Sequence, residues 1–327
     1  MNAAPAHSPR LRKPRIGVLE CLVWLAALAV LAVFDGYLTL AASIAIMALF
    51  VLSLDLALGF AGIVTLGHAV FFGTGAYAAA LIALGGWQEP ITGVLMAGGL
   101  SAVLALIVGI LILHLHGLPL IMTTLAFGLI VHSVANVAGD ITGGDNGLQD
   151  IKLKPLFGTF PWSVVGQTSY LYALAWLFVL FVVARKLVAS PFGLALHGIR
   201  QNRDRMQLLG ANVTVQLVTI YVFSGFMAGV AGALSAQTTK FVGLEVYSLD
   251  MSATVLIMLV LGGFGRLYGA IVGTVVYMVI HHFAAIVDPY NWMFAIGVLL
   301  VAVVLVARGG LMGLLERAHG AIARRRS

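Results

Sequence analysis

The sequence predicts an all-α, polytopic integral membrane protein. Apolar residues make up 61% of its 327 residues and charged residues only 9%, whereas a soluble domain is about 45–50% apolar and about 25% charged. The mean hydropathy is +1.06. So few charged side chains could not solvate a globule of this size, which argues against a soluble enzyme, a nucleic-acid-binding protein and a disordered chain.

Long apolar runs predict the individual spans. A transmembrane helix needs about 20 apolar residues to cross about 30 Å of hydrocarbon. Ten runs of uneven quality approach this length, so we expect eight to eleven spans, with ten as the best count. In chain order the runs are 17–34, 38–58, 68–85, 91–113, 118–138, 168–189, 214–236, 248–264, 267–286 and 291–307. The first run is longer than a signal-peptide core and lacks a cleavage site, so we interpret it as a retained span.

The basic residues predict that both termini are cytoplasmic. With the N-terminus inside, all but three of the 18 Lys and Arg residues fall on the cytoplasmic side, the exceptions being Lys152, Lys154 and Lys240. This is the positive-inside pattern, so the net charge of +6 is an orientation signal and does not indicate nucleic acid. The expected parts are a basic cytoplasmic tail (1–15), a transmembrane domain (16–307) and a second basic cytoplasmic tail (308–327).

Two segments outside the spans stand out. The outer loop 139–167 is rich in Gly, Asp and Pro, which favour turns. The inner segment 190–210 predicts one short amphipathic helix, because Ser190 suits an N-cap, Pro191 suits the first helical position and Gly210 suits the stop. From the pattern alone, this helix either connects two spans or serves as a docking helix for a cytoplasmic motor.

Several blocks of the chain carry a family resemblance. They are 58–69 (LGFAGIVTLGHA), 124–128 (TLAFG), 142–148 (TGGDNGL), 190–202 (SPFGLALHGIRQN), 209–214 (LGANVT) and 261–265 (LGGFG). In the same order they resemble motifs of the LivM-type permeases, the membrane subunits of ABC importers for branched-chain amino acids and related small solutes. The resemblance covers about residues 35–310. The chain departs from the family at Asp55, where Asn is usual, and at 201–204, where an Arg-Glu-Asn-Glu-like run is common.

The resemblance implies a non-catalytic permease without cofactor or metal in a bacterial inner membrane. Its partners would be a homologous second permease subunit, two cytoplasmic ATPase subunits and a periplasmic solute-binding protein, all assembled at the lipid bilayer. The residues expected at the ATPase are Gly193, Ile199, Arg200, Asn202, Arg203, Asp204 and Gly210. Those expected at the binding protein are Gly143, Gly144, Asn146 and Gly147, although they also fit an ordinary flexible loop.

Residues 62–68 predict a broken helix at membrane depth, since Gly62, Val64, Thr65 and Gly67 all disfavour a helix. Irregular backbone is tolerated there only where it lines protein or a water-filled path. Such a segment would present amides and carbonyls to a zwitterionic solute. The candidate path residues are Asp55, Gly62, Thr65, Gly67, His68, Thr124, Gly128, Gly262 and Gly263, although many of these glycines also fit simple helix packing.

Asp55 is the most informative ionisable residue, because a carboxylate within a span should face the bundle or water. His68, His114 and His116 are candidate partners at a similar level. The alternative is that Asp55 lies close enough to the headgroups to stay solvated.

Two other function classes compete with the permease. An ion-coupled secondary transporter would need charged coupling residues at mid-membrane, and these are nearly absent. An intramembrane enzyme would need a Ser/His, paired Asp or zinc constellation. The adjacent His281 and His282 cannot share a helix face, and the single Cys21 excludes an intrachain disulfide or a thiolate cluster.

Overall fold

The computed structural model describes residues 24–29, 31, 35–156, 158, 162, 166–287, 297 and 310–313. These residues are predominantly helical, which confirms the all-α prediction, and a short antiparallel bridge joins Leu148 to Val242. The predicted tails 1–15 and 308–327 and the predicted spans 17–34 and 291–307 lie wholly or mostly outside the described residues.

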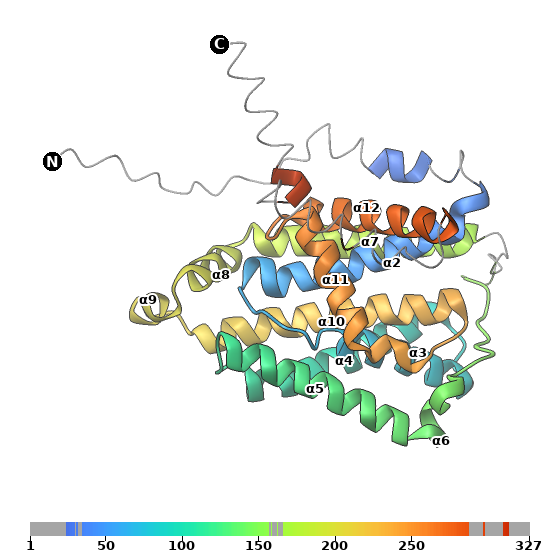
Figure 1. Ribbon diagram of the computed structural model, residues 1–327, viewed down its shortest axis with the longest axis horizontal. Coiled ribbons are helices and arrows are strands. Elements are labelled where there is room, and N and C mark those ends of the chain that lie inside the picture. The colour runs from blue at the N-terminus through green and yellow to red at the C-terminus, as the bar shows by residue number, and fades with distance from the viewer. Residues whose placement is uncertain are drawn as a thin grey trace, which may run out of the picture.

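The helices form a bundle whose members run roughly along one axis (Figure 1). In chain order they are η1 (Asp35–Tyr37), α2 (Leu38–Leu54), η2 (Asp55–Phe60), α3 (Ala69–Leu84), α4 (Pro90–Ile112), α5 (Leu118–Val137), α6 (Gly139–Thr142), η3 (Gly144–Asn146), α7 (Gln167–Val188), α8 (Pro191–Gln201), α9 (Arg203–Leu208), α10 (Val213–Thr239), η4 (Leu244–Tyr247), α11 (Leu249–Gly262) and α12 (Leu267–Val287). The element η2 is a single wide turn of π-helix that continues α2.

Six helices of the described part are long and apolar enough to cross a membrane, counting α2 and η2 as one. The predicted runs 68–85 and 248–264 form the shorter apolar helices α3 and α11. The helix α3 begins only at Ala69 because the residues before it are irregular. The helix α11 ends at Gly262 because the next residue, Gly263, has a φ of +107°, which only glycine adopts readily.

The core is built around α10, which packs against α2, α3 and α4. Gly229 and Gly232 let α10 approach closely, because an added Cβ would meet the Ser101 side chain of α4 or the Phe72 backbone of α3. In the most apolar stretch of α10, 78% is buried, against 17% for α5. The helix α5 is therefore the least buried of these helices.

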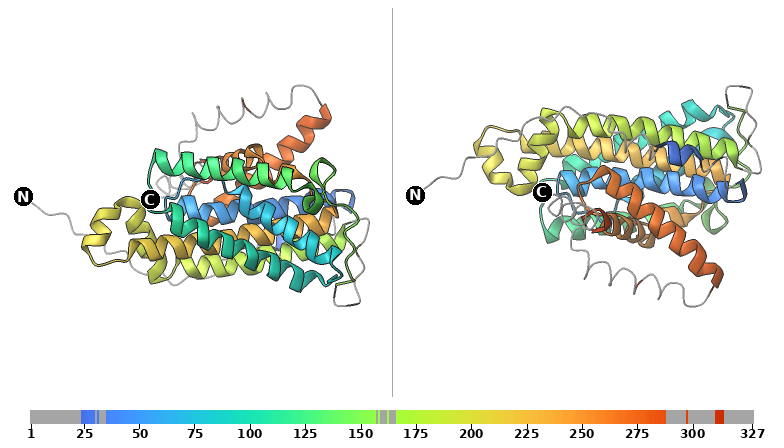
Figure 2. Two further views of the ribbon diagram at one scale, coloured as in Figure 1. Left: turned by 90° about the horizontal axis from the view of Figure 1, so that it is seen from below. Right: turned by 90° about the horizontal axis from the view of Figure 1, so that it is seen from above.

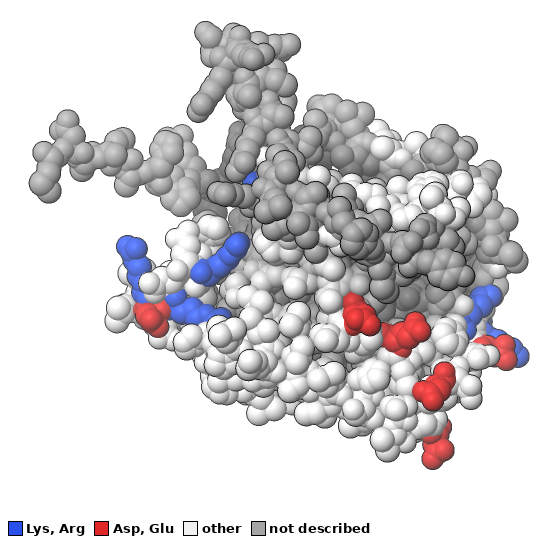
Figure 3. Space-filling view, viewed as in Figure 1, with Lys and Arg blue, Asp and Glu red and all other residues white. Residues whose placement is uncertain are grey.

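The two ends of the bundle differ in charge. The helices α8 and α9 lie at one end and α6 at the other, and both views of Figure 2 place α8 and α9 beyond the end of the bundle. Basic side chains gather at the end with α8 and α9, whereas most acidic side chains in view lie toward the other end (Figure 3). The two segments that the sequence assigns to opposite sides of the membrane are thus at opposite ends.

The prediction of one helix over 190–210 is wrong, because two short helices fill this segment. The backbone of Asn202 is extended, with φ −159° and ψ 108°, and it ends α8. Its Oδ1 accepts a hydrogen bond from the backbone N–H of Arg205 at 2.9 Å, so Asn202 is the N-cap of α9. Ser190 is the N-cap of α8 by position only, since its hydroxyl donates backward to the Leu187 carbonyl.

Candidate functional site

Asp55 is completely buried at the point where α2 passes into η2. Its Oδ1 accepts a hydrogen bond of 2.7 Å from the backbone N–H of Gly265, in the turn between α11 and α12. Asp55 therefore faces the bundle, as expected, and the alternative of headgroup solvation is not what the structure shows. None of the three candidate histidines is its hydrogen-bond partner among the described residues.

Glycines make this junction possible. A Cβ added at Gly59 would collide with the Asp55 carboxylate and with the Gly265 nitrogen. Gly265 itself has a φ of +69°, a conformation that an L side chain rarely adopts. Gly59 and Gly265 thus allow η2 to lie directly against the turn between α11 and α12.

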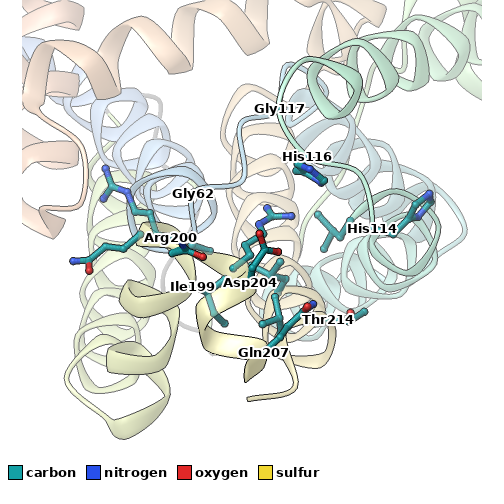
Figure 4. Close-up of a pocket in the computed structure, with 16 residues that line it drawn as sticks. Gly62, His114, His116, Gly117, Ile199, Arg200, Asp204, Gln207 and Thr214 are labelled. Atoms are coloured by element: carbon teal, nitrogen blue, oxygen red, sulfur yellow. The ribbon is translucent and has the colours of Figure 1, made fainter. Parts of the chain in front are cut away.

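Arg200 reaches the same place from α8. Its Nη1 donates a hydrogen bond to the Gly59 carbonyl, and its side chain passes Gly62 on the way. In Figure 4 the Arg200 side chain extends away from Asp204 and His114. We call the group of Asp55, Gly59, Arg200 and Gly265 the inner junction. It joins α8, in the expected docking segment, to η2 and to the turn between α11 and α12.

Residues 61–68 form an irregular segment, as predicted, and we call it the strap. Neighbouring side chains accept hydrogen bonds from the strap and from the start of α3: Leu66 N–H donates to Thr124 Oγ1 at 3.3 Å, and Ala69 N–H donates to Ser252 Oγ at 3.1 Å. A Cβ added at Gly67 would meet the Thr124 carbonyl. The structure therefore brings the strap, Thr124 and Gly128 of α5 together, although they are far apart in the sequence.

The predicted path residues of the strap are mostly buried within the chain. Thr65 and His68 are 2% and 1% exposed, whereas Val64 is 37% exposed. The cavity beside Gly67 and Gly128 holds only about 10 Å³, which is about one water molecule. Solute contact by these residues stays a prediction, and it would need a surface outside this chain or a change of conformation.

His68 is held by a hydrogen-bonded network in the core. The Ser53 hydroxyl donates to the Phe50 carbonyl at 2.6 Å, and its oxygen lies 2.9 Å from His68 Nε2. Because the hydroxyl hydrogen is already used, Ser53 Oγ accepts from the Nε2–H of His68. Ser224 of α10 donates in turn to the Ser53 carbonyl at 2.6 Å, so the network ties the strap to α2 and α10.

A polar cavity of about 590 Å³ opens between α8, α9, the start of α10 and the connection from α4 to α5 (Figure 4). His114 and His116 line it together with Arg203 and Asp204. Partial burial lowers the pKa of Arg203 from its ordinary value, and its Nη1 donates to the Leu115 carbonyl at 3.4 Å.

The predicted docking residues divide into two groups. Gly193 and Ile199 are buried, and a Cβ at Gly193 would meet the Val188 carbonyl. Arg200, Asn202, Asp204 and Gly210 are exposed, and Arg203 is half-buried between the two groups.

Sequence reasoning missed the surface of α9, where Leu208 and Leu209 are 88% and 72% exposed beside Arg205. An apolar pair next to a helix stop is the signal that could have shown this surface.

The predicted binding-protein residues form a turn-rich cluster that follows α6. Gly143, Gly144 and Gly147 all have positive φ, and a Cβ at Gly147 would meet the Val242 carbonyl. The following residue, Leu148, exchanges hydrogen bonds of 2.8 and 3.0 Å with Val242. This loop is therefore tied to the connection after α10, and Asn146 is exposed at its tip.

The chain matches the family described as "Branched-chain amino acid transport system / permease component" over residues 36–304. The high-affinity branched-chain amino acid transport system permease protein LivM of Salmonella typhimurium is 31% identical over 287 residues, or 80% of this chain and 66% of that protein. LivM of Escherichia coli is 30% identical over the same shares. The galactose/methyl galactoside import permease protein MglC of Salmonella typhimurium is 29% identical over 231 residues, or 65% of each chain.

The chain thus spans just under two thirds of the length of these LivM relatives. No solved structure matches it at a significant level.

Proposed function

Because the chain belongs to the family of branched-chain amino acid transport permeases, we propose that it is the membrane subunit of an ATP-driven importer. Its cargo is a branched-chain amino acid or a related small polar solute that moves into the cytoplasm. The chain itself carries out no covalent chemistry, and ATP is hydrolysed on two partner subunits. The observation that carries this proposal is the family match over residues 36–304, and the two short helices α8 and α9 at the basic end of the bundle supply a surface for the ATPase.

The surface of α9 is suited to a protein partner. Leu208 and Leu209 expose apolar side chains beside the charged Arg205 and Asp204. Aliphatic anchors with a polar rim are typical of protein interfaces. In this proposal the ATPase contacts the exposed residues of α9, while the buried Gly193 and Ile199 set the position of α8.

A second permease subunit would complete the path. Thr65 and His68 are buried within the described chain, so in this proposal the solute path lies at a surface shared by two subunits. The outward surface of α5 supports this, because Ser133 and Asn136 are exposed on it. Polar side chains inside a membrane usually face protein or water.

The cytoplasmic side is the end with α8 and α9, by the positive-inside rule. In a bacterial inner membrane the opposite end would face the periplasm, where the exposed Asn146 and its glycine-rich loop would meet a solute-binding protein.

Uptake of radiolabelled leucine by cells with and without the gene tests the function. Uptake should stop when ATP is depleted at an intact membrane potential, and it should continue when the proton gradient is dissipated. The opposite result would identify an ion-coupled secondary transporter. Labelled galactose is the matched cargo control, since a relative is named as a galactose permease, and uptake of galactose instead of leucine would correct the cargo.

A further inference from the structure

The inner junction contains a buried carboxyl group that solute contact does not explain. Asp55 is fully buried, and its Oδ2 has no hydrogen-bond partner among the described residues. A buried carboxylate is costly unless it is hydrogen-bonded and compensated by a positive charge. Oδ1 has its hydrogen bond to Gly265 N–H, and Arg200 supplies the nearby positive charge.

Arg200 belongs to a different part of the protein from Asp55. It is the penultimate residue of α8, in the segment proposed to receive the ATPase, and it hydrogen-bonds to the Gly59 carbonyl of η2. Gly59 lies against both Asp55 and Gly265. A continuous chain of contacts thus runs from α8 through Gly59 and Asp55 to Gly265.

The far end of this chain of contacts is a glycine turn between two apolar helices. Gly263 and Gly265 have φ values of +107° and +69°. Gly262 and Gly273 hold α11 and α12 in backbone contact, because an added Cβ at either residue would meet backbone atoms of the other helix. Glycines with positive φ at such a turn can absorb a change in the angle between two helices.

We propose that Asp55 is a positioning residue that couples movement of α8 to the turn between α11 and α12. Displacement of α8 shifts Arg200, which shifts Gly59 and Asp55, and the Asp55–Gly265 hydrogen bond passes the shift to α11 and α12. This inference rests on the proposed function, because a partner on α8 must supply the movement. It assigns Asp55 to transmission and not to contact with the solute.

The direct test compares variants of the assembled complex in proteoliposomes, using labelled leucine and measuring solute moved per ATP hydrolysed. Asp55→Leu and Arg200→Gln should each lower this ratio about tenfold, within the usual size of coupling between sites. Asp55→Asn should keep most of the ratio, because its amide oxygen still accepts from Gly265 N–H. Lys186→Gln is the matched control, since Lys186 is an exposed basic residue at the end of α7 and outside the proposed docking surface.

The double variant separates transmission from general damage. If Asp55 and Arg200 act in one chain of contacts, Asp55→Leu combined with Arg200→Gln should be no worse than either change alone. Additive losses would overturn the proposal, and so would an unchanged ratio in Asp55→Leu or Arg200→Gln. Arg200→Gln lies outside the spans, so it keeps the test decisive if Asp55→Leu does not assemble.

A distance measurement tests the link without any transport assay. Spin labels at Gln201→Cys and Phe264→Cys, in a Cys21→Ala background, report on α8 and on the exposed glycine turn. Arg200→Gln should broaden the distance distribution, whereas Lys186→Gln should leave it unchanged. An unchanged distribution in Arg200→Gln would overturn the link. Failure of ATP-dependent uptake in the unmodified complex would instead reject the proposed function.

Discussion

At the scale of single residues, the contacts of the buried His68 side chain distinguish a structural role from solute binding. Its ring stacks on Phe50 at 5.5 Å between centroids, and its Nε2–H donates to Ser53. Its side chain is almost without exposed surface. These contacts favour a role in holding the strap against α2.

His68→Ala should therefore lower stability before it affects transport. The lost packing and hydrogen bond should cost about 2–4 kcal/mol, which would appear as a lower melting temperature of the protein in detergent. Val64→Ala, on the exposed face of the same strap, is the control and should melt like the unmodified protein. Unchanged stability of His68→Ala with loss of leucine uptake would instead support the path role predicted from the sequence.

Gly67 sets the distance between the strap and α5. Gly67→Ala would place a methyl group against the Thr124 carbonyl, and relief of that contact should cost about 1–3 kcal/mol. Gly99→Ala in α4 is the matched control, because nothing lies within 4 Å of its added Cβ. The yield of folded protein after detergent extraction should fall for Gly67→Ala only. Equal yields would mean that the strap and α5 separate freely.

At the scale of elements, α8 and α9 have different parts in the proposed docking. Gly198 faces Met206, since its added Cβ would lie 2.7 Å from the Met206 sulfur. A bulky residue at Gly198 would therefore separate α8 from α9 and would not report on docking alone. The exposed surface of α9 offers cleaner variants.

Leu208→Glu and Arg205→Glu should abolish co-purification of the ATPase subunits, because each places a negative charge on the exposed tip of α9. Membrane insertion should be unchanged, since both residues lie outside the spans. Lys240→Glu makes the same charge reversal at the opposite end of the bundle and should retain the ATPase. Retention of the ATPase by both α9 variants would reduce this segment to a connector between spans.

At the scale of the whole molecule, the separation of charge between the two ends predicts the orientation in the membrane. In a Cys21→Ala background, a membrane-impermeant thiol reagent added outside spheroplasts should label Asn146→Cys and not Asn202→Cys. Both positions are exposed and lie in the two end segments of the bundle. Labelling of position 202 from outside would reverse the orientation. Labelling of both after permeabilisation controls for accessibility.

The composition and the apolar runs were enough to predict an all-α membrane protein. Inside a bilayer the backbone N–H and C=O groups of an apolar run must hydrogen-bond to one another, and a helix achieves this within the run. The motifs also gave the family. The helix lengths were less predictable, since hydropathy does not show where backbone geometry interrupts a run. The positive φ of Gly263 ends α11, and the irregular strap delays the start of α3.

The burial of Asp55 inside the bundle followed from the cost of a charge in lipid, which depends only on its place in an apolar run. Its partners did not follow, because Gly265 and Arg200 are more than 140 residues away along the chain. Only the packing of η2 against the turn after α11 decides which backbone N–H meets the carboxylate. The sequence by itself determined the fold class, the family and the need for a buried Asp55. The tertiary structure decided that Asp55 lies between α8 and the glycine turn after α11, because contacts between distant segments depend on how the helices pack.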